Sequence, residues 1–159
     1  MDFYTFFQII VASVLATSAM TLFSYAMSAS FRELYKEPVL LTFILTQINL
    51  EVSVQTKKYL AWSLHYLIGL LFVIAYHLLW YYNILTISIL STLLLGALSG
   101  IIGIIGWVLM FKMADYKPNI DFKGYYIQLF FAHIIFAIVA VTAYYLLSTV
   151  SVLINAYTS

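Results

Sequence analysis

Four long apolar segments alternate with short polar ones along the 159 residues of this chain. We expect these segments at about residues 3–27, 59–82, 85–111 and 124–151, and none of them contains Asp, Glu, Lys or Arg. An α-helix needs about 20 apolar residues to cross the hydrocarbon core of a bilayer. The pattern therefore predicts an all-α integral membrane protein, a bundle of four transmembrane helices.

A shorter element is expected between the first two spans, at about 38–55. It opens with Glu37 and Pro38, and proline is tolerated in the first turn of a helix. Four small or polar residues follow at spacings that place them on one helical face: Thr42, Thr46, Asn49 and Ser53. The apolar remainder is too short to cross a bilayer, so we expect an amphipathic interfacial helix. A re-entrant segment and a helix docked on a partner protein are the alternatives.

Composition supports this reading and limits the chain to one domain. The chain is 65% hydrophobic and 8% charged, and its mean hydropathy is +1.03, whereas soluble domains contain roughly a quarter charged residues. Four spans leave only short connections, so residues 1–159 form a single membrane domain. The absence of cysteine excludes disulfides and thiolate metal sites.

The basic residues predict the orientation in the membrane. All seven fall in two stretches between spans: Arg32, Lys36, Lys57, Lys58, Lys112, Lys117 and Lys123. Cytoplasmic segments near spans are enriched in Lys and Arg. We therefore expect residues 28–58 and 112–123 on the cytoplasmic side and both termini outside. The five carboxylates of these stretches are expected on a solvated face: Glu33, Glu37, Glu51, Asp115 and Asp121.

Small residues mark the faces on which the spans are expected to pack. Lipid gives little hydrophobic drive for helices to associate, so their interfaces rely on small side chains. Gly69 of the second span and Gly96, Gly100 and Gly103 of the third are the candidates. Packing is the favoured interpretation, and a ligand pocket or a gate is the alternative.

The histidines are candidate functional residues, because an ionisable side chain inside a membrane span usually has a function. His65 and His133 lie at similar depths on small-residue faces, whereas His77 lies near Trp80 at the outer boundary. We expect His65 and His133 to face one cavity. The candidate pocket residues are Trp62, His65, Tyr76, Tyr126 and His133. The alternatives are axial ligation of a b-type haem by His65 and His133, a metal site with a poor ligand set, and simple hydrogen bonding to neighbouring groups.

Two short stretches, 64–69 and 128–133, resemble segments of small four-helix bacterial membrane proteins. The resemblance implies a location in the bacterial inner membrane and no activity.

No enzymatic motif is present, so we expect a non-enzymatic membrane module. It is either an accessory subunit or a binder of a lipid or small hydrophobic ligand, using the inward pocket in its cytoplasmic half. The expected partners are the bilayer and either another membrane protein or further copies of this chain, and not nucleic acid. A haem-binding electron-transfer subunit and an oligomeric small channel or transporter are the alternative functions.

Overall fold

The computed structural model describes residues 3–48 and 51–158, which form helices and no strand. The helices are α1 (Phe3–Phe31), α2 (Glu37–Gln47), α3 (Val54–Tyr81), α4 (Ile89–Met113) and α5 (Phe122–Thr158). The four long helices α1, α3, α4 and α5 are each apolar enough and long enough to cross a membrane. The prediction of an all-α, four-span membrane bundle is confirmed, and the chain is a multi-pass integral membrane protein.

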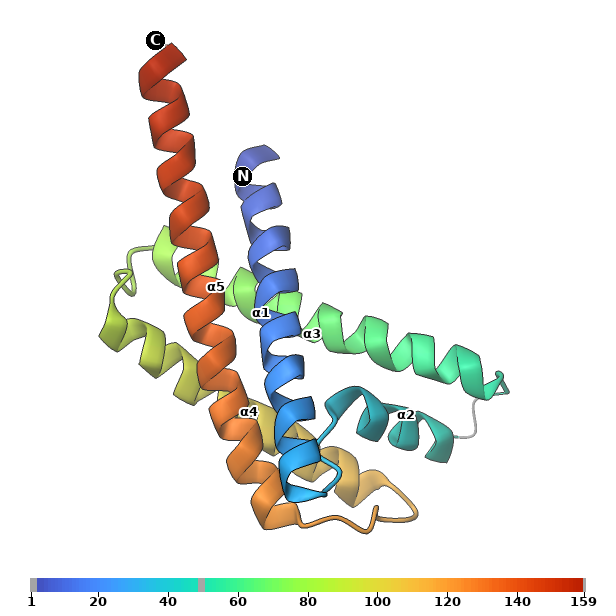
Figure 1. The fold of residues 1–159 in the computed structure, drawn as a ribbon. Helices are drawn as coiled ribbons and strands as arrows, with labels where there is room; N and C mark the ends of the chain where they lie inside the picture. The colour runs from blue at the N-terminus through green and yellow to red at the C-terminus, as the bar shows by residue number, and fades with distance from the viewer. Residues whose placement is uncertain (1–2, 49–50, 159) are drawn as a thin grey trace.

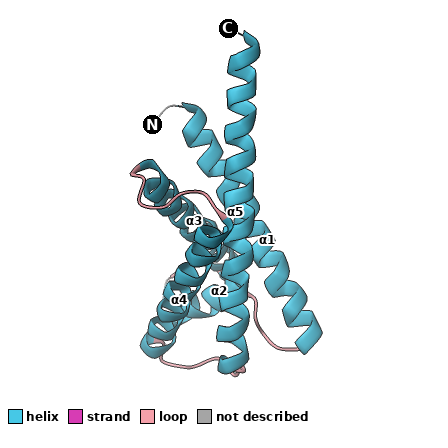
Figure 2. Cartoon of the chain, turned by 90° about the vertical axis from the view of Figure 1, so that its left-hand side faces the viewer, coloured by secondary structure: helices cyan, strands magenta, loops and turns pink. Residues whose placement is uncertain are grey.

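The long helices cross one another and are not all parallel. Helices α1 and α5 run side by side in opposite directions, so both termini lie at the same end of the molecule (Figure 1). Helices α3 and α4 form a hairpin that crosses this pair obliquely, and the short helix α2 packs on α3 (Figures 1 and 2). The most extensive interfaces are α1 with α5 and α4 with α5. Helix α5 is therefore the central element of the bundle.

Glycines of α4 allow it to approach α5 closely. A Cβ atom at Gly96 would lie 2.9 Å from the Cα atom of Ile134, and one at Gly100 would lie 3.0 Å from the Phe130 ring. A Cβ at Gly103 would lie 2.7 Å from the His133 ring, whereas Gly106 has no neighbour within 4 Å. Each of the first three glycines therefore faces α5 at a distance that a larger side chain would not permit.

A glycine of α3 has a similar position against α1. A Cβ atom at Gly69 would collide with the hydroxyl of Thr17, and it would also lie 3.4 Å from the Phe136 ring of α5. Gly69 thus lies at the point where α3 crosses the α1 and α5 pair.

The short helix ends earlier than predicted. Helix α2 stops at Gln47, and α3 begins at Val54, where the Ser53 side chain accepts a hydrogen bond from the Thr56 amide at 3.1 Å. Thr42 and Thr46 therefore belong to α2, Ser53 caps α3, and Asn49 lies outside the described residues. The expected continuous polar face from 42 to 53 is wrong, since a helix cap and not a longer helix occupies its second half.

Two residues in the left-handed conformation end α1 and α3. Arg32 has a φ of 57° and Asn83 a φ of 54°, and this conformation often terminates helices. The first turn is further held by Ser28, whose hydroxyl donates to the Glu33 carbonyl and accepts from the Tyr35 amide at 3.4 Å. The chain reverses here, and the reversal brings the start of α2 against α1 and α5.

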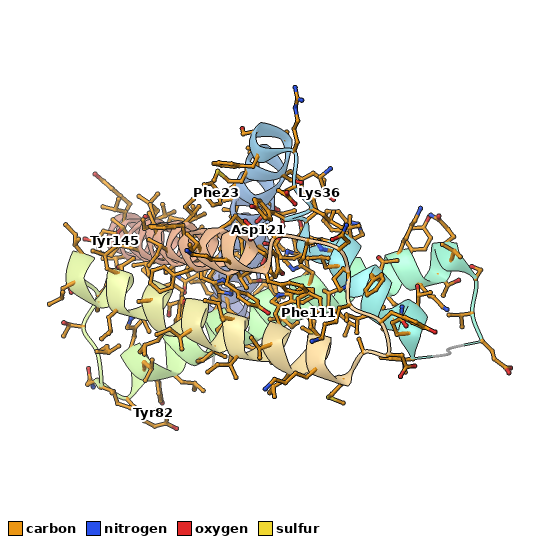
Figure 3. All side chains as sticks on the ribbon, turned by 90° about the horizontal axis from the view of Figure 1, so that it is seen from below. Phe23, Lys36, Tyr82, Phe111, Asp121 and Tyr145 are labelled. Atoms are coloured by element: carbon orange, nitrogen blue, oxygen red, sulfur yellow. The ribbon has the colours of Figure 1, made fainter. Side chains whose placement is uncertain are left out.

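Figure 3 views the molecule from the end that carries the α1–α2 and α4–α5 connections. In this view the labelled residues show where the two ends of the α3–α4 hairpin lie. Lys36, Phe111 and Asp121 lie near the junction of α1, α2 and α5, whereas Tyr82 lies at the far turn (Figure 3).

The α1–α2 and α4–α5 connections lie at the opposite end of the molecule from the chain termini (Figure 1). Arg32, Lys36 and Lys117 belong to these connections, whereas Lys57 and Lys58 lie in the first turns of α3.

Candidate functional site

All five helices contribute to one cavity of about 210 Å³. Its wall is mainly apolar, with polar groups from Thr17 of α1, Glu37 of α2, His65 of α3 and His133 of α5, and with the indole ring of Trp107 from α4. Both histidines that the sequence placed on inward faces therefore line the same cavity. The glycine side of α4 forms the opposite wall, through Gly103 and Gly106.

Glu37 is enclosed by protein, with 1% of its surface exposed. The Ser24 hydroxyl donates to its Oε1 at 2.6 Å, and the Gln128 amide in turn donates to Ser24 at 2.6 Å. Its other oxygen, Oε2, has no hydrogen-bond partner, and no cation of the described residues is paired with it. Burial raises the pKa of the Glu37 carboxyl from 4.5 to about 7, although hydrogen bonds, first among them that from Ser24, limit the rise.

The expectation that Glu37 lies on a solvated face is wrong. The left-handed turn at Arg32 and the helix start at Pro38 direct the first turn of α2 toward α1 and α5 and away from solvent. The only sequence signal was an acidic residue directly before a proline that opens an apolar helix. The other four carboxylates of these stretches are not buried.

The hydrogen bonds of His65 define which of its nitrogens carries the proton. Its Nε2 lies 2.9 Å from the Thr21 hydroxyl, and that hydroxyl donates its one hydrogen to the Thr17 carbonyl at 2.7 Å. Thr21 must therefore accept from His65, so Nε2 carries the hydrogen. In a neutral imidazole this leaves Nδ1 as a hydrogen-bond acceptor.

His133 has the opposite tautomer. Its Nδ1 lies 2.9 Å from the Leu129 carbonyl, which can only accept, so Nδ1 carries the hydrogen. Nε2 is then an acceptor, and it lies next to Gly103 on the cavity wall. The edge of the His133 ring also packs against Phe72, with ring centroids 5.7 Å apart.

The other three candidate pocket residues do not line this cavity. The Tyr76 hydroxyl bonds Ser99 at 2.8 Å in the interface between α3 and α4. Tyr76 lies about 16 Å along α3 from His65, because a helix rises about 1.5 Å per residue. Tyr76 and His65 therefore lie on the same face of α3 but at different depths along it.

Trp62 and Tyr126 belong to aromatic clusters outside the cavity. The Trp62 ring stacks on Tyr66 with centroids 6.3 Å apart. Tyr126 packs on Tyr125 at 5.7 Å near the α4–α5 connection. Both positions fit side chains that anchor helices near a membrane boundary.

His77 lies in a third group, near the C-terminal end of α3. Its Nδ1 shares a hydrogen bond of 2.7 Å with the Tyr144 hydroxyl of α5, and Trp80 packs on the Tyr144 ring at 4.9 Å. This histidine therefore joins α3 to α5 away from the cavity.

The residues around the cavity do not fit a haem. Pockets that enclose drug-sized ligands measure about 300–1,000 Å³, and a haem is larger than such ligands, whereas this cavity measures about 210 Å³. The Nε2 of His133 lies against the α4 backbone, and the Nε2 of His65 donates to Thr21. Within residues 3–48 and 51–158, no group of three or more His, Cys, Asp or Glu is arranged to hold a metal.

The cavity has the volume of a small molecule and is lined in part by exposed residues. An apolar cavity of about 150 Å³ in another protein holds benzene, so about 210 Å³ accommodates one ring with a short polar group. Two of the lining residues are largely exposed, Ile68 of α3 at 43% and Ile102 of α4 at 57%. The mouth of the cavity therefore lies between α3 and α4. Comparisons of the chain with protein-family models, curated proteins and solved structures find no match.

Proposed function

We propose that this protein is a non-enzymatic membrane module that binds a small, mainly apolar molecule in the cavity between its helices. The main support for this proposal is the composition of the cavity wall, which is mostly apolar but includes a few polar groups from different helices. Ligand sites commonly have this composition, because apolar surface supplies affinity and a few polar groups fix orientation. An accessory subunit of a larger membrane complex with the same cavity remains compatible with this proposal.

We further propose a bacterial inner-membrane location, with both termini in the periplasm. The supports are the seven basic residues in the segments 28–58 and 112–123, and the position of both termini at one end of the bundle (Figure 1). The cavity then lies in the cytoplasmic half, since Glu37 belongs to the first of these segments.

Ligand binding can be tested with a substitution that fills the cavity without disturbing the helices. Gly106 lines the cavity and has no neighbour within 4 Å, so Gly106→Leu places a side chain in the space with no backbone collision. Trp107 lines the same cavity and can report on its contents. Trp62→Phe and Trp80→Phe make it the only tryptophan of a chain that has three.

In this background we expect benzyl alcohol to change the Trp107 fluorescence in a saturable way in detergent, and Gly106→Leu to remove the saturable part. Ile105→Leu is the matched control, because Ile105 lies on the exposed side of α4 one residue away. A saturable response that persists in Gly106→Leu, or none in the parent protein, would contradict the proposal.

A further inference from the structure

The polar atoms around the cavity are unevenly divided between donors and acceptors. Glu37 Oε2 has no partner, and an ionised carboxylate only accepts hydrogen bonds. The hydrogen bonds to Thr21 and to Leu129 leave His65 Nδ1 and His133 Nε2 as acceptors. Thr17 adds a hydroxyl, which can both donate and accept, and Trp107 adds an indole N–H donor. The part of the wall around Glu37 therefore favours a ligand that donates hydrogen bonds.

The charge of the site points in the same direction. A carboxylate that is 1% exposed pays a large desolvation cost unless an opposite charge compensates it. The described residues supply a hydrogen bond from Ser24 and no paired cation. The missing partner is a positive group with several N–H donors, which is the description of an ammonium head.

From this geometry we propose that the ligand of the cavity is a small organic ammonium ion, whose head lies at Glu37 and whose apolar body lies among the aromatic side chains of the wall. The inference rests on the proposed ligand-binding function and specifies its ligand class. Phe72, Trp107 and Phe136 line the cavity, and aromatic faces attract ammonium groups as well as apolar ones. The volume of about 210 Å³ limits the body to about one ring.

The groups that titrate around Glu37 come from each helix packed against it. Tyr25 of α1 and Tyr125 of α5 interact electrostatically with its carboxyl. His65 of α3 and His133 of α5 line the same cavity, and Lys36 is its chain neighbour, with Nζ over the Tyr25 ring at 4.8 Å. Glu37 is the only acidic side chain among the residues that line the cavity, so a proton and an ammonium head compete for it.

The experiment compares three probes of similar size on the whole protein in detergent: benzylammonium, neutral benzyl alcohol and anionic benzoate. We expect benzylammonium to bind about tenfold or more tightly than benzyl alcohol, as close charge pairs do, and benzoate not to bind. We also expect the affinity for benzylammonium to fall as the pH is lowered from 8 to 5, with no such change for benzyl alcohol. This second measurement needs no variant.

Glu37→Gln is the decisive variant, because it keeps the shape and removes the charge. We expect it to bind benzylammonium no better than benzyl alcohol, with affinity for the alcohol retained. Glu33→Gln, in the same connection but not at the cavity, is the control that should behave as the parent protein.

Equal affinities for the amine and the alcohol in the parent protein would overturn the ammonium assignment and leave the proposed binding function intact. An unchanged preference for the amine in Glu37→Gln would also overturn it. If none of the three probes binds the parent protein, both the assignment and the proposed function fail.

Discussion

At the scale of single residues, the informative side chain is Glu37, an acidic group in a position where its charged form is poorly solvated. Ser24 and Gln128 stabilise one of its oxygens through a chain of hydrogen bonds. The other oxygen is left without a partner. The side chain is therefore held in place by α1 and α5, and Glu37 is at the same time one of the residues that line the cavity.

This burial makes the stability of the protein depend on pH. The pKa of Glu37 in the folded protein, about 7, lies above its ordinary value of 4.5. The folded state thus binds the proton of Glu37 more tightly, so the stability that this carboxyl contributes is fully present below pH 4.5 and is lost as the pH rises through about 7. We expect this contribution to fall by the order of 3 kcal/mol over this interval. It is measured as the difference between the thermal-unfolding midpoints of the parent protein and Glu37→Gln in detergent without ligand, because the histidines add their own pH dependence to both proteins.

The midpoint of the parent protein relative to that of Glu37→Gln should therefore fall between pH 5 and 8, because only the parent protein takes up a proton at this position on folding. Glu33→Gln should keep the pH dependence of the parent protein. A relative midpoint that stays constant or rises with pH would show that the buried carboxyl makes no such contribution.

At the scale of elements, the glycines of α4 differ in what a side chain would meet. At Gly96 the nearest atom belongs to the backbone of α5, which cannot move without moving the helix. At Gly103 it belongs to the His133 ring, and at Gly106 there is open space. The four glycines of one helix therefore make graded contributions to packing.

We expect Gly96→Ala to destabilise the bundle by roughly 1–3 kcal/mol, the usual cost of overpacking. Gly106→Ala should leave stability unchanged or slightly raised, since the added methyl group meets nothing within 4 Å. Thermal unfolding of both variants in the same detergent provides the comparison. Equal midpoints for the two would mean that the close approach of α4 to α5 is not needed for stability.

The elements differ in how far the sequence alone could predict them. The spans were predictable because the cost of charge in lipid keeps ionised residues out of them, and segments without any such residue are easily seen. The end of α2 could not be predicted in this way. Small polar residues such as Ser53 can either continue a polar helix face or cap the next helix, and here Ser53 caps α3.

The site was predictable only where helical periodicity determines direction. His65 and His133 were expected on inward faces, and both line the cavity. Tyr76 shares the face of His65 but not its depth, and depth depends on how obliquely α3 crosses its neighbours. The burial of Glu37 depends on the chain reversal at Arg32, a tertiary feature with no periodic signal.

At the scale of the whole molecule, α5 is the helix that exceeds the thickness of the hydrocarbon core by the widest margin. Helix α5 has 37 residues, or about 55 Å at 1.5 Å per residue, against about 30 Å for the hydrocarbon core. Its last turns extend past the start of α1 (Figure 1). The C-terminal end therefore projects from the side on which both termini lie.

The orientation can be tested by labelling, because the chain contains no cysteine. Tyr157 near the C-terminus is 88% exposed, and Tyr116 in the α4–α5 connection is 73% exposed. We expect a membrane-impermeant maleimide to label Tyr157→Cys in intact cells and Tyr116→Cys only after the membrane is permeabilised. The reverse pattern would invert the proposed topology.

If the cavity binds a ligand as proposed, the mouth between Ile68 and Ile102 has a consequence for how the ligand reaches it. These side chains are exposed on the apolar outer surface of α3 and α4, so the medium in front of them is lipid. Under the proposed function, ligands would dissolve in the bilayer first and move sideways into the protein. Occupancy at a given aqueous concentration would then rise with the partition coefficient of the ligand, and two molecules of equal fit would be ranked by their solubility in the membrane.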